Sequence, residues 1–71
     1  MGKPILHIEY GVEASDDGTF NAFSQAGDQP RRYAGPFATR ADAYAHNEKS
    51  YAEVKAIVAR HGAKAIRRDV Q

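Results

Sequence analysis

The chain has 71 residues, of which 42% are hydrophobic, and a formal net charge of +1. A chain of this length can build only a small core, so residues 1–71 are expected to form a single domain. It contains no cysteine, which excludes disulfides and thiolate metal sites and is typical of a reducing compartment. No apolar run is long enough to span a bilayer, and a cytoplasmic location without membrane contact is therefore the expectation.

The first half of the sequence predicts three strands. Residues 5–14 alternate apolar and polar side chains, which is typical of a half-buried strand, and an Asp-Gly pair at 17–18 favours a tight reversal. Residues 19–25 form the second strand, and their period places Phe20 and Phe23 on opposite faces, with one of them expected to be exposed. Residues 31–34 form a short third strand that Gly35 and Pro36 end, and Pro30 favours a late start or an edge position.

A long helix is the strongest predicted element. Thr39 is suited to the N-cap, Asp42 stands three residues later, and Gly62 follows the end, which predicts a helix over 40–61. Asn47 interrupts its apolar stripe, so a break near residues 46–50 is the alternative to a continuous helix. The side chains expected to face the sheet are Ala43, Tyr44, Tyr51, Val54, Ile57, Val58 and His61.

Residues 63–70 predict a last strand, with Ile66 and Val70 on one side. The expected fold is α+β with the order β-β-β-α-β, in which one helix packs on one face of a small, mainly antiparallel sheet.

No catalytic or metal signature is present. His7 lies on the predicted first strand, whereas His46 and His61 lie 15 residues apart on the predicted helix, so no pair of histidines has the spacing that places two ligands on one helical face. The serines lack a nucleophile motif, and a single helix on a short sheet leaves little room for a pocket. The sequence therefore predicts a non-catalytic binding protein without a metal or a small-molecule cofactor.

Charge is distributed unevenly along the chain. Residues 1–28 sum to −4 and residues 29–71 to +5, a pattern that suggests an anionic partner, although two halves that neutralise each other in the fold are the plainer interpretation. Glu9 and Glu13 would repel phosphate from the first strand. The candidate nucleic-acid-binding residues are therefore the arginines of the third strand, helix start and last strand: Arg31, Arg32, Arg40, Arg67 and Arg68. These arginines could equally serve only to keep the surface hydrated.

The alternative is a protein-interaction or inhibitory factor, which would contact a partner protein or a second copy of the chain through the back of the helix or an exposed edge strand. The predicted back of the helix is a strip of small side chains that would allow close approach, although alanine also simply favours helix formation. Its members are Ala41, Ala45, Ala52, Ala56 and Ala59.

Residues 31–44, preceded by two strands joined through Asp-Asp-Gly, resemble the strand-to-helix junction of the arm-type DNA-binding domains of phage integrases. The residues that carry the resemblance are Phe37, Thr39 and Ala43, which match a Phe-x-Thr-x-x-x-Ala motif. It implies a three-stranded sheet that enters the major groove of DNA, and a protein of phage or mobile-element type.

Overall fold

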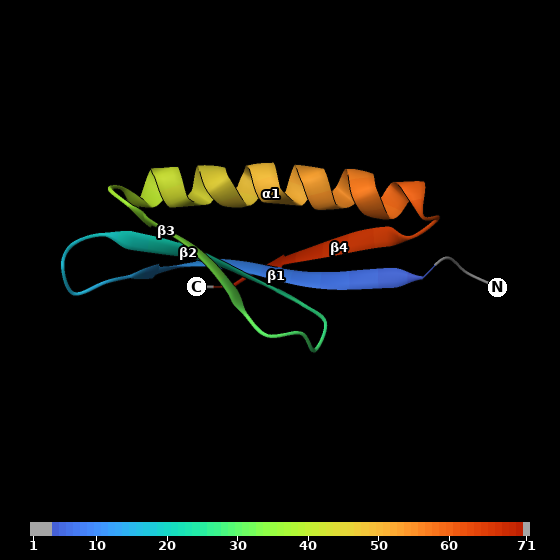
Figure 1. The fold of residues 1–71 in the computed structure, drawn as a ribbon, viewed down its shortest axis with the longest axis horizontal. Coiled ribbons are helices and arrows are strands. Elements are labelled where there is room, and N and C mark those ends of the chain that lie inside the picture. The colour runs from blue at the N-terminus through green and yellow to red at the C-terminus, as the bar shows by residue number, and fades with distance from the viewer. Residues whose placement is uncertain (1–3, 71) are drawn as a thin grey trace.

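The computed structural model describes residues 4–70 and has one helix lying along one face of a four-stranded sheet (Figure 1). The elements are β1 (Ile5–Ala14), β2 (Phe20–Ala26), β3 (Arg32–Phe37), α1 (Arg40–Arg60) and β4 (Lys64–Asp69). The strand order across the sheet is β3-β2-β1-β4. The α+β class and the predicted order of elements are confirmed.

The β1–β2 hairpin closes where the sequence predicted it. Gly18 has a φ of 86°, and the Ser15 amide donates to the Thr19 carbonyl at 2.8 Å. The Asp17 carboxylate accepts hydrogen bonds from the amide and the hydroxyl of Thr19, and these bonds hold the pKa of Asp17 below its ordinary value. The local chemistry of this turn therefore fixes the register of the two longest strands.

The third strand is longer than predicted. It was expected to end before Gly35, but β3 continues through Pro36 to Phe37, which pairs with Phe20. A register shift at this point gives β3 an extra residue, and Gly35 adopts a φ of 131°. Because β3 is an edge strand, the missing amide of Pro36 costs no bond to a further strand.

The helix is continuous, so the alternative of a break near residues 46–50 is wrong. The Thr39 hydroxyl accepts from the Asp42 amide at 3.1 Å, as the capping pattern predicted. At the other end Gly62 has a φ of 73°, and the Ala63 amide donates to the Val58 carbonyl at 2.9 Å. This pattern is a Schellman motif, which closes the helix one residue earlier than expected.

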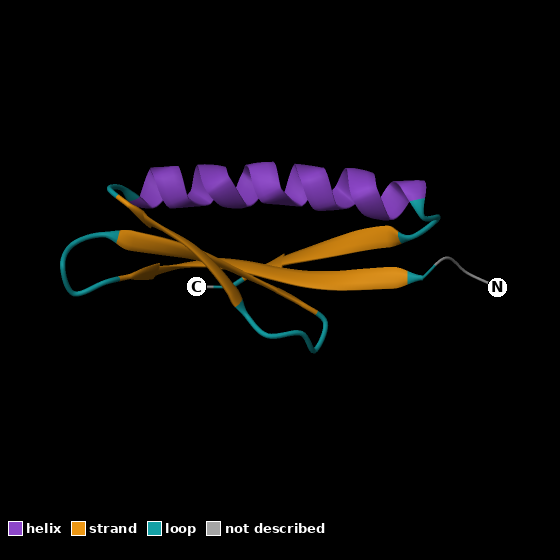
Figure 2. Cartoon of the chain, in the orientation of Figure 1, coloured by secondary structure: helices purple, strands orange, loops and turns teal. Residues whose placement is uncertain are grey.

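β4 pairs with β1 in parallel, which makes the sheet mixed (Figure 2). The small core lies mainly between α1 and the two central strands, where Ile8, Tyr10, Val12, Ala22 and Ala43 are buried. The prediction that Phe20 and Phe23 face opposite sides is confirmed, because Phe20 packs against that core and Phe23 does not. Neither ring is exposed, contrary to expectation, since Phe23 is buried over Gly11.

The buried stripe of α1 is narrower than predicted. Ala43 is buried and Tyr51, Val54 and Val58 are half-buried, as expected. Tyr44 and Ile57 lie at the two edges of the stripe and are exposed, and His61 lies beyond the helix end and is also exposed. The polar Asn47, in the middle of the stripe, is only 2% exposed.

Candidate functional site

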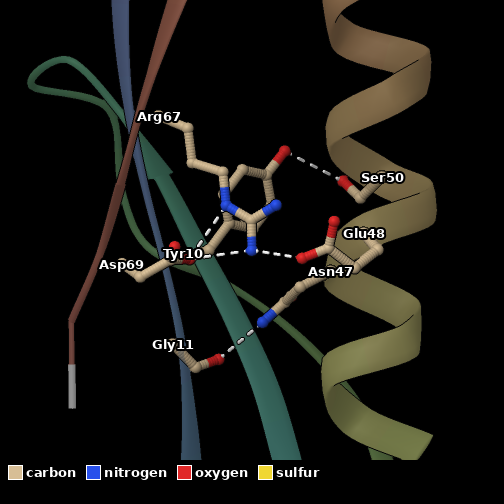
Figure 3. Close-up of polar contacts among 7 residues, drawn as sticks. All are labelled: Tyr10, Gly11, Asn47, Glu48, Ser50, Arg67 and Asp69. Atoms are coloured by element: carbon tan, nitrogen blue, oxygen red, sulfur yellow. Dashed lines mark hydrogen bonds and ion pairs between the residues drawn. The ribbon is translucent and has the colours of Figure 1, made fainter.

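Polar contacts at the centre of the molecule fix α1 against β1 (Figure 3). Asn47 donates from Nδ2 to the Gly11 carbonyl at 2.9 Å, and this bond satisfies the amide that interrupts the apolar stripe. One turn later, the Ser50 hydroxyl lies 3.3 Å from the hydroxyl of the fully buried Tyr10. These two contacts set the position of the helix along the strand.

Arg67 is the third connection between sheet and helix. Its guanidinium lies 5.3 Å from the Tyr10 ring centre and 5.4 Å from that of Tyr51. One of its terminal nitrogens lies 2.6 Å from Glu48 Oε1 and 2.8 Å from Asp69 Oδ1 (Figure 3). Arg67 thus joins β4 to α1 across two aromatic rings.

Electrostatics supports this structural role for Arg67. Its hydrogen bond lowers the pKa of Glu48, and the same bond raises the pKa of Arg67 above its ordinary value. The Arg67 side chain is only 18% exposed. Because two carboxylates of its own chain balance its charge through Nε and one terminal nitrogen, Arg67 is not free to neutralise a ligand.

Arg31 is committed in a similar way on the other side of the sheet. Its guanidinium lies 3.1 Å from Glu13 Oε1 and 4.2 Å from the centre of the Phe23 ring. Phe23 in turn lies 6.1 Å from Tyr33, measured between ring centres. Arg31 therefore completes a local cluster with one carboxylate and two aromatic rings.

The remaining three candidate arginines lie far apart in the fold. Arg68 extends from the β4 edge toward Glu9, at 3.9 Å, whereas Arg32 belongs to β3 at the opposite edge. Arg40 begins the helix and stacks 4.9 Å from the Phe20 ring centre. The structure consequently spreads the five predicted arginines over two sheet edges and two faces.

The sheet face opposite α1, here called the open face, is uncovered (Figure 2). Strand alternation and pairing place three large, exposed apolar side chains on it: Ile5, Tyr33 and Ile66, which are 53%, 58% and 39% exposed. The sequence predicted that Ile66 and Val70 share one side of the last strand. Ile66 lies on the face of the sheet that points away from α1. The open face also holds the pairs Arg31–Glu13 and Arg68–Glu9.

The back of α1 is the other exposed surface that the sequence singled out. All five alanines of the predicted strip are exposed. Within residues 4–70, no helix combines the length and apolar character that crossing a membrane requires.

The chain matches no protein-family model, no curated protein sequence and no solved structure. The resemblance to integrase arm-type domains therefore stays a prediction.

Sequence reasoning missed Tyr33 and Ile66 as surface candidates. The position of Tyr33 could have been predicted, because an antiparallel hairpin of β2 and β3 places Tyr33 beside Phe23. Ile66 had no comparable signal, since its neighbours Ala65 and Arg67 gave no apolar alternation to set the face of β4.

Proposed function

We propose that this chain is a non-catalytic binding module that contacts a partner protein through the open face. One observation carries the proposal: both carboxylates among the face residues named above already have an arginine of the same chain beside them, at 3.1 Å and 3.9 Å. What remains unmatched there is the ammonium group of Lys64, which forms no ion pair within residues 4–70, and apolar area supplied mainly by Ile5, Tyr33 and Ile66.

A surface with paired charges and exposed apolar side chains suits a protein partner better than a nucleic acid. Protein interfaces favour aromatic side chains and arginine at their centre, with charged groups of both signs at the rim. A phosphate backbone instead requires an excess of free cations, and its affinity depends on them. Glu9 and Glu13 occupy β1, in the interior of the sheet, where they would lie against phosphate.

Nucleic acid is kept as the second candidate because of one arrangement. Arg31, Phe23 and Tyr33 lie side by side on an open sheet, which is how single-stranded nucleic acids are stacked in other folds. Under this alternative, Arg31 would leave Glu13 to reach phosphate.

Site-specific photo-crosslinking separates these candidates. A photoreactive phenylalanine analogue replaces Tyr33 on the open face, and a matched sample carries it at Tyr44 on α1, which is also an exposed tyrosine. We expect position 33 to capture a protein in the source cells and position 44 to capture none. The mass of the adduct distinguishes a second copy of the chain from a different protein.

Two further measurements complete the test. With the captured protein purified, Tyr33→Ser should weaken binding by roughly 10-fold or more, as expected for an aromatic anchor, while Tyr44→Ser should not. Titration with single-stranded and duplex DNA at two salt concentrations tests the second candidate. Salt-dependent DNA binding that Tyr33→Ser abolishes, together with no protein adduct at position 33, would replace the protein partner by nucleic acid.

A further inference from the structure

A groove of about 390 Å³ lies on the helix side of the sheet, between α1 and the β2–β3 hairpin. Here it is called the hairpin groove. Its lining includes Leu6, Ile8, Ser24, Arg32, Ser50 and Val54. The expectation that one helix on a short sheet leaves little room is wrong for this chain, because β2 presents only Ser24 and Ala26 beneath this part of the helix.

The position of α1 explains why the groove stays open. The contacts that fix the helix reach β1 and β4, through Tyr10–Ser50 and Arg67–Glu48. Among residues 4–70 no hydrogen bond or ion pair joins the helix to β3, which it meets instead through the rings of His46 and Phe37, 5.5 Å apart between centres. The helix covers the central strands, and the groove stays open toward the end of the hairpin, where β2 presents only Ser24 and Ala26.

The hairpin groove has an electropositive mouth and an apolar floor. Leu6, Ile8 and Val54 supply the floor, and none of the lining residues is Asp or Glu. A smaller hollow of about 240 Å³ continues from it, shares Ser24, Arg32 and Ser50, and also contains no acidic residue. The carboxylate of Glu53 lines a further hollow that shares Ser50 with the groove, and Lys49 lines that hollow beside it.

Arg32 is the cation that this groove leaves available. It lines both hollows, and within residues 4–70 its guanidinium has no ion pair and no hydrogen bond. Arg31 also lines the larger hollow, but its guanidinium is occupied by Glu13 on the other side of the sheet.

We propose that the hairpin groove binds a small monocarboxylate with an apolar body. The fork of Arg32 matches a planar carboxylate, the hydroxyls of Ser24 and Ser50 can donate to its oxygens, and the apolar part would lie on the floor. One free guanidinium balances one negative charge, which favours a carboxylate over a phosphate dianion. Pockets for small ligands have volumes of about 300–1,000 Å³, a range that includes this groove. The site lies on the opposite side of the sheet from the open face, so it does not depend on the proposed protein contact.

Octanoate is the probe, titrated into the isotope-labelled full chain while backbone amide signals are followed by NMR at pH 7 and constant ionic strength. We expect saturable shifts clustered at Ser24, Arg32 and Ser50, with no comparable response to octylammonium, octanol or acetate. Equal shifts from octylammonium or octanol would overturn the role of Arg32, and shifts confined to the open face would overturn the site.

Matched variants test the groove itself. Arg32→Gln should weaken octanoate binding by roughly 10- to 100-fold, the usual effect of losing a charged hydrogen bond, whereas Arg68→Gln on the open face should leave it unchanged. Arg32→Lys keeps the charge but loses the fork, so it should also weaken binding. Ala26→Leu should block the groove without disturbing the open face. Undiminished binding by folded Arg32→Gln would refute the proposal.

Discussion

The Gly11–Phe23 contact gives the sharpest test of how the open face is built. A Cβ added at Gly11 would lie 2.2 Å, 2.6 Å and 2.9 Å from three atoms of the Phe23 ring, distances that real Cβ contacts essentially never show. Phe23 is 6% exposed and lies on the open face, so its ring can move toward solvent. Gly11→Ala should therefore force this ring off the sheet.

The cost follows from what the displaced ring loses. Exposing a buried phenylalanine costs about 1.5–3 kcal/mol, and the stacking with Tyr33 and Arg31 is worth about 1 kcal/mol more. Replacing glycine by alanine within a strand by itself stabilises the fold by about 0.5–1 kcal/mol. We expect a net loss of about 1.5–3.5 kcal/mol in the free energy of unfolding, measured by urea denaturation followed by circular dichroism.

A double-mutant cycle makes this prediction refutable. In a Phe23→Val background the ring is gone, so Gly11→Ala should become neutral or stabilising by about 0.5 kcal/mol. The sign of the effect thus reverses between the two backgrounds. If Gly11→Ala destabilises both backgrounds equally, or neither, then the ring is not what requires glycine at this position.

Three further predictions concern the helix. Asn47→Ala removes the buried hydrogen bond to Gly11 and should cost about 1 kcal/mol in denaturant unfolding, whereas alanine at an exposed helix position should be neutral. Thr39→Ala removes the N-cap and should cost about 1 kcal/mol, seen as a lower melting temperature, with Thr39→Ser retaining most of the stability. Because Arg67 holds the pKa of Glu48 below its ordinary 4.5, the bond stabilises the fold above that pH and is lost as the pH falls through the lowered pKa. Acid titrations of wild type and Glu48→Gln should therefore diverge above pH 4.5 and converge at lower pH, and parallel curves would contradict the role of this bond.

Strong local signals allowed the sequence to predict β1, its turn and the ends of the helix. Alternation over residues 5–14 set the first strand, and Thr39 and Gly62 set the helix to within one residue. The parallel pairing of β4 could also have been derived. A helix that covers a sheet returns the chain to the end where the preceding strand began, so β4 must run parallel to β3 and hence to β1.

The features that the sequence did not reveal depend on strand pairing and ion pairs between residues far apart in the chain. β3 continued through Pro36 because a register shift against β2 accommodated an extra residue, and no local pattern indicates such a shift. The five arginines could be listed from the sequence as a basic group, but their separation depended on the strand order and on the carboxylates that Arg31, Arg67 and Arg68 met. Arg67 met Glu48 only because β4 and α1 lie side by side.

The polar contacts of the small core position the helix beside the hairpin groove. With few large aliphatic side chains beneath α1, the helix is positioned by Asn47, Ser50 and the Arg67–Glu48 pair. Directional bonds of this kind have a narrow optimum, unlike apolar contacts, so they specify where the helix lies over the sheet. These bonds reach β1 and β4, and beside β2 the hairpin groove stays open where that strand presents only Ser24 and Ala26. The opposite face is uncovered because the one helix within residues 4–70 lies on the other side of the sheet.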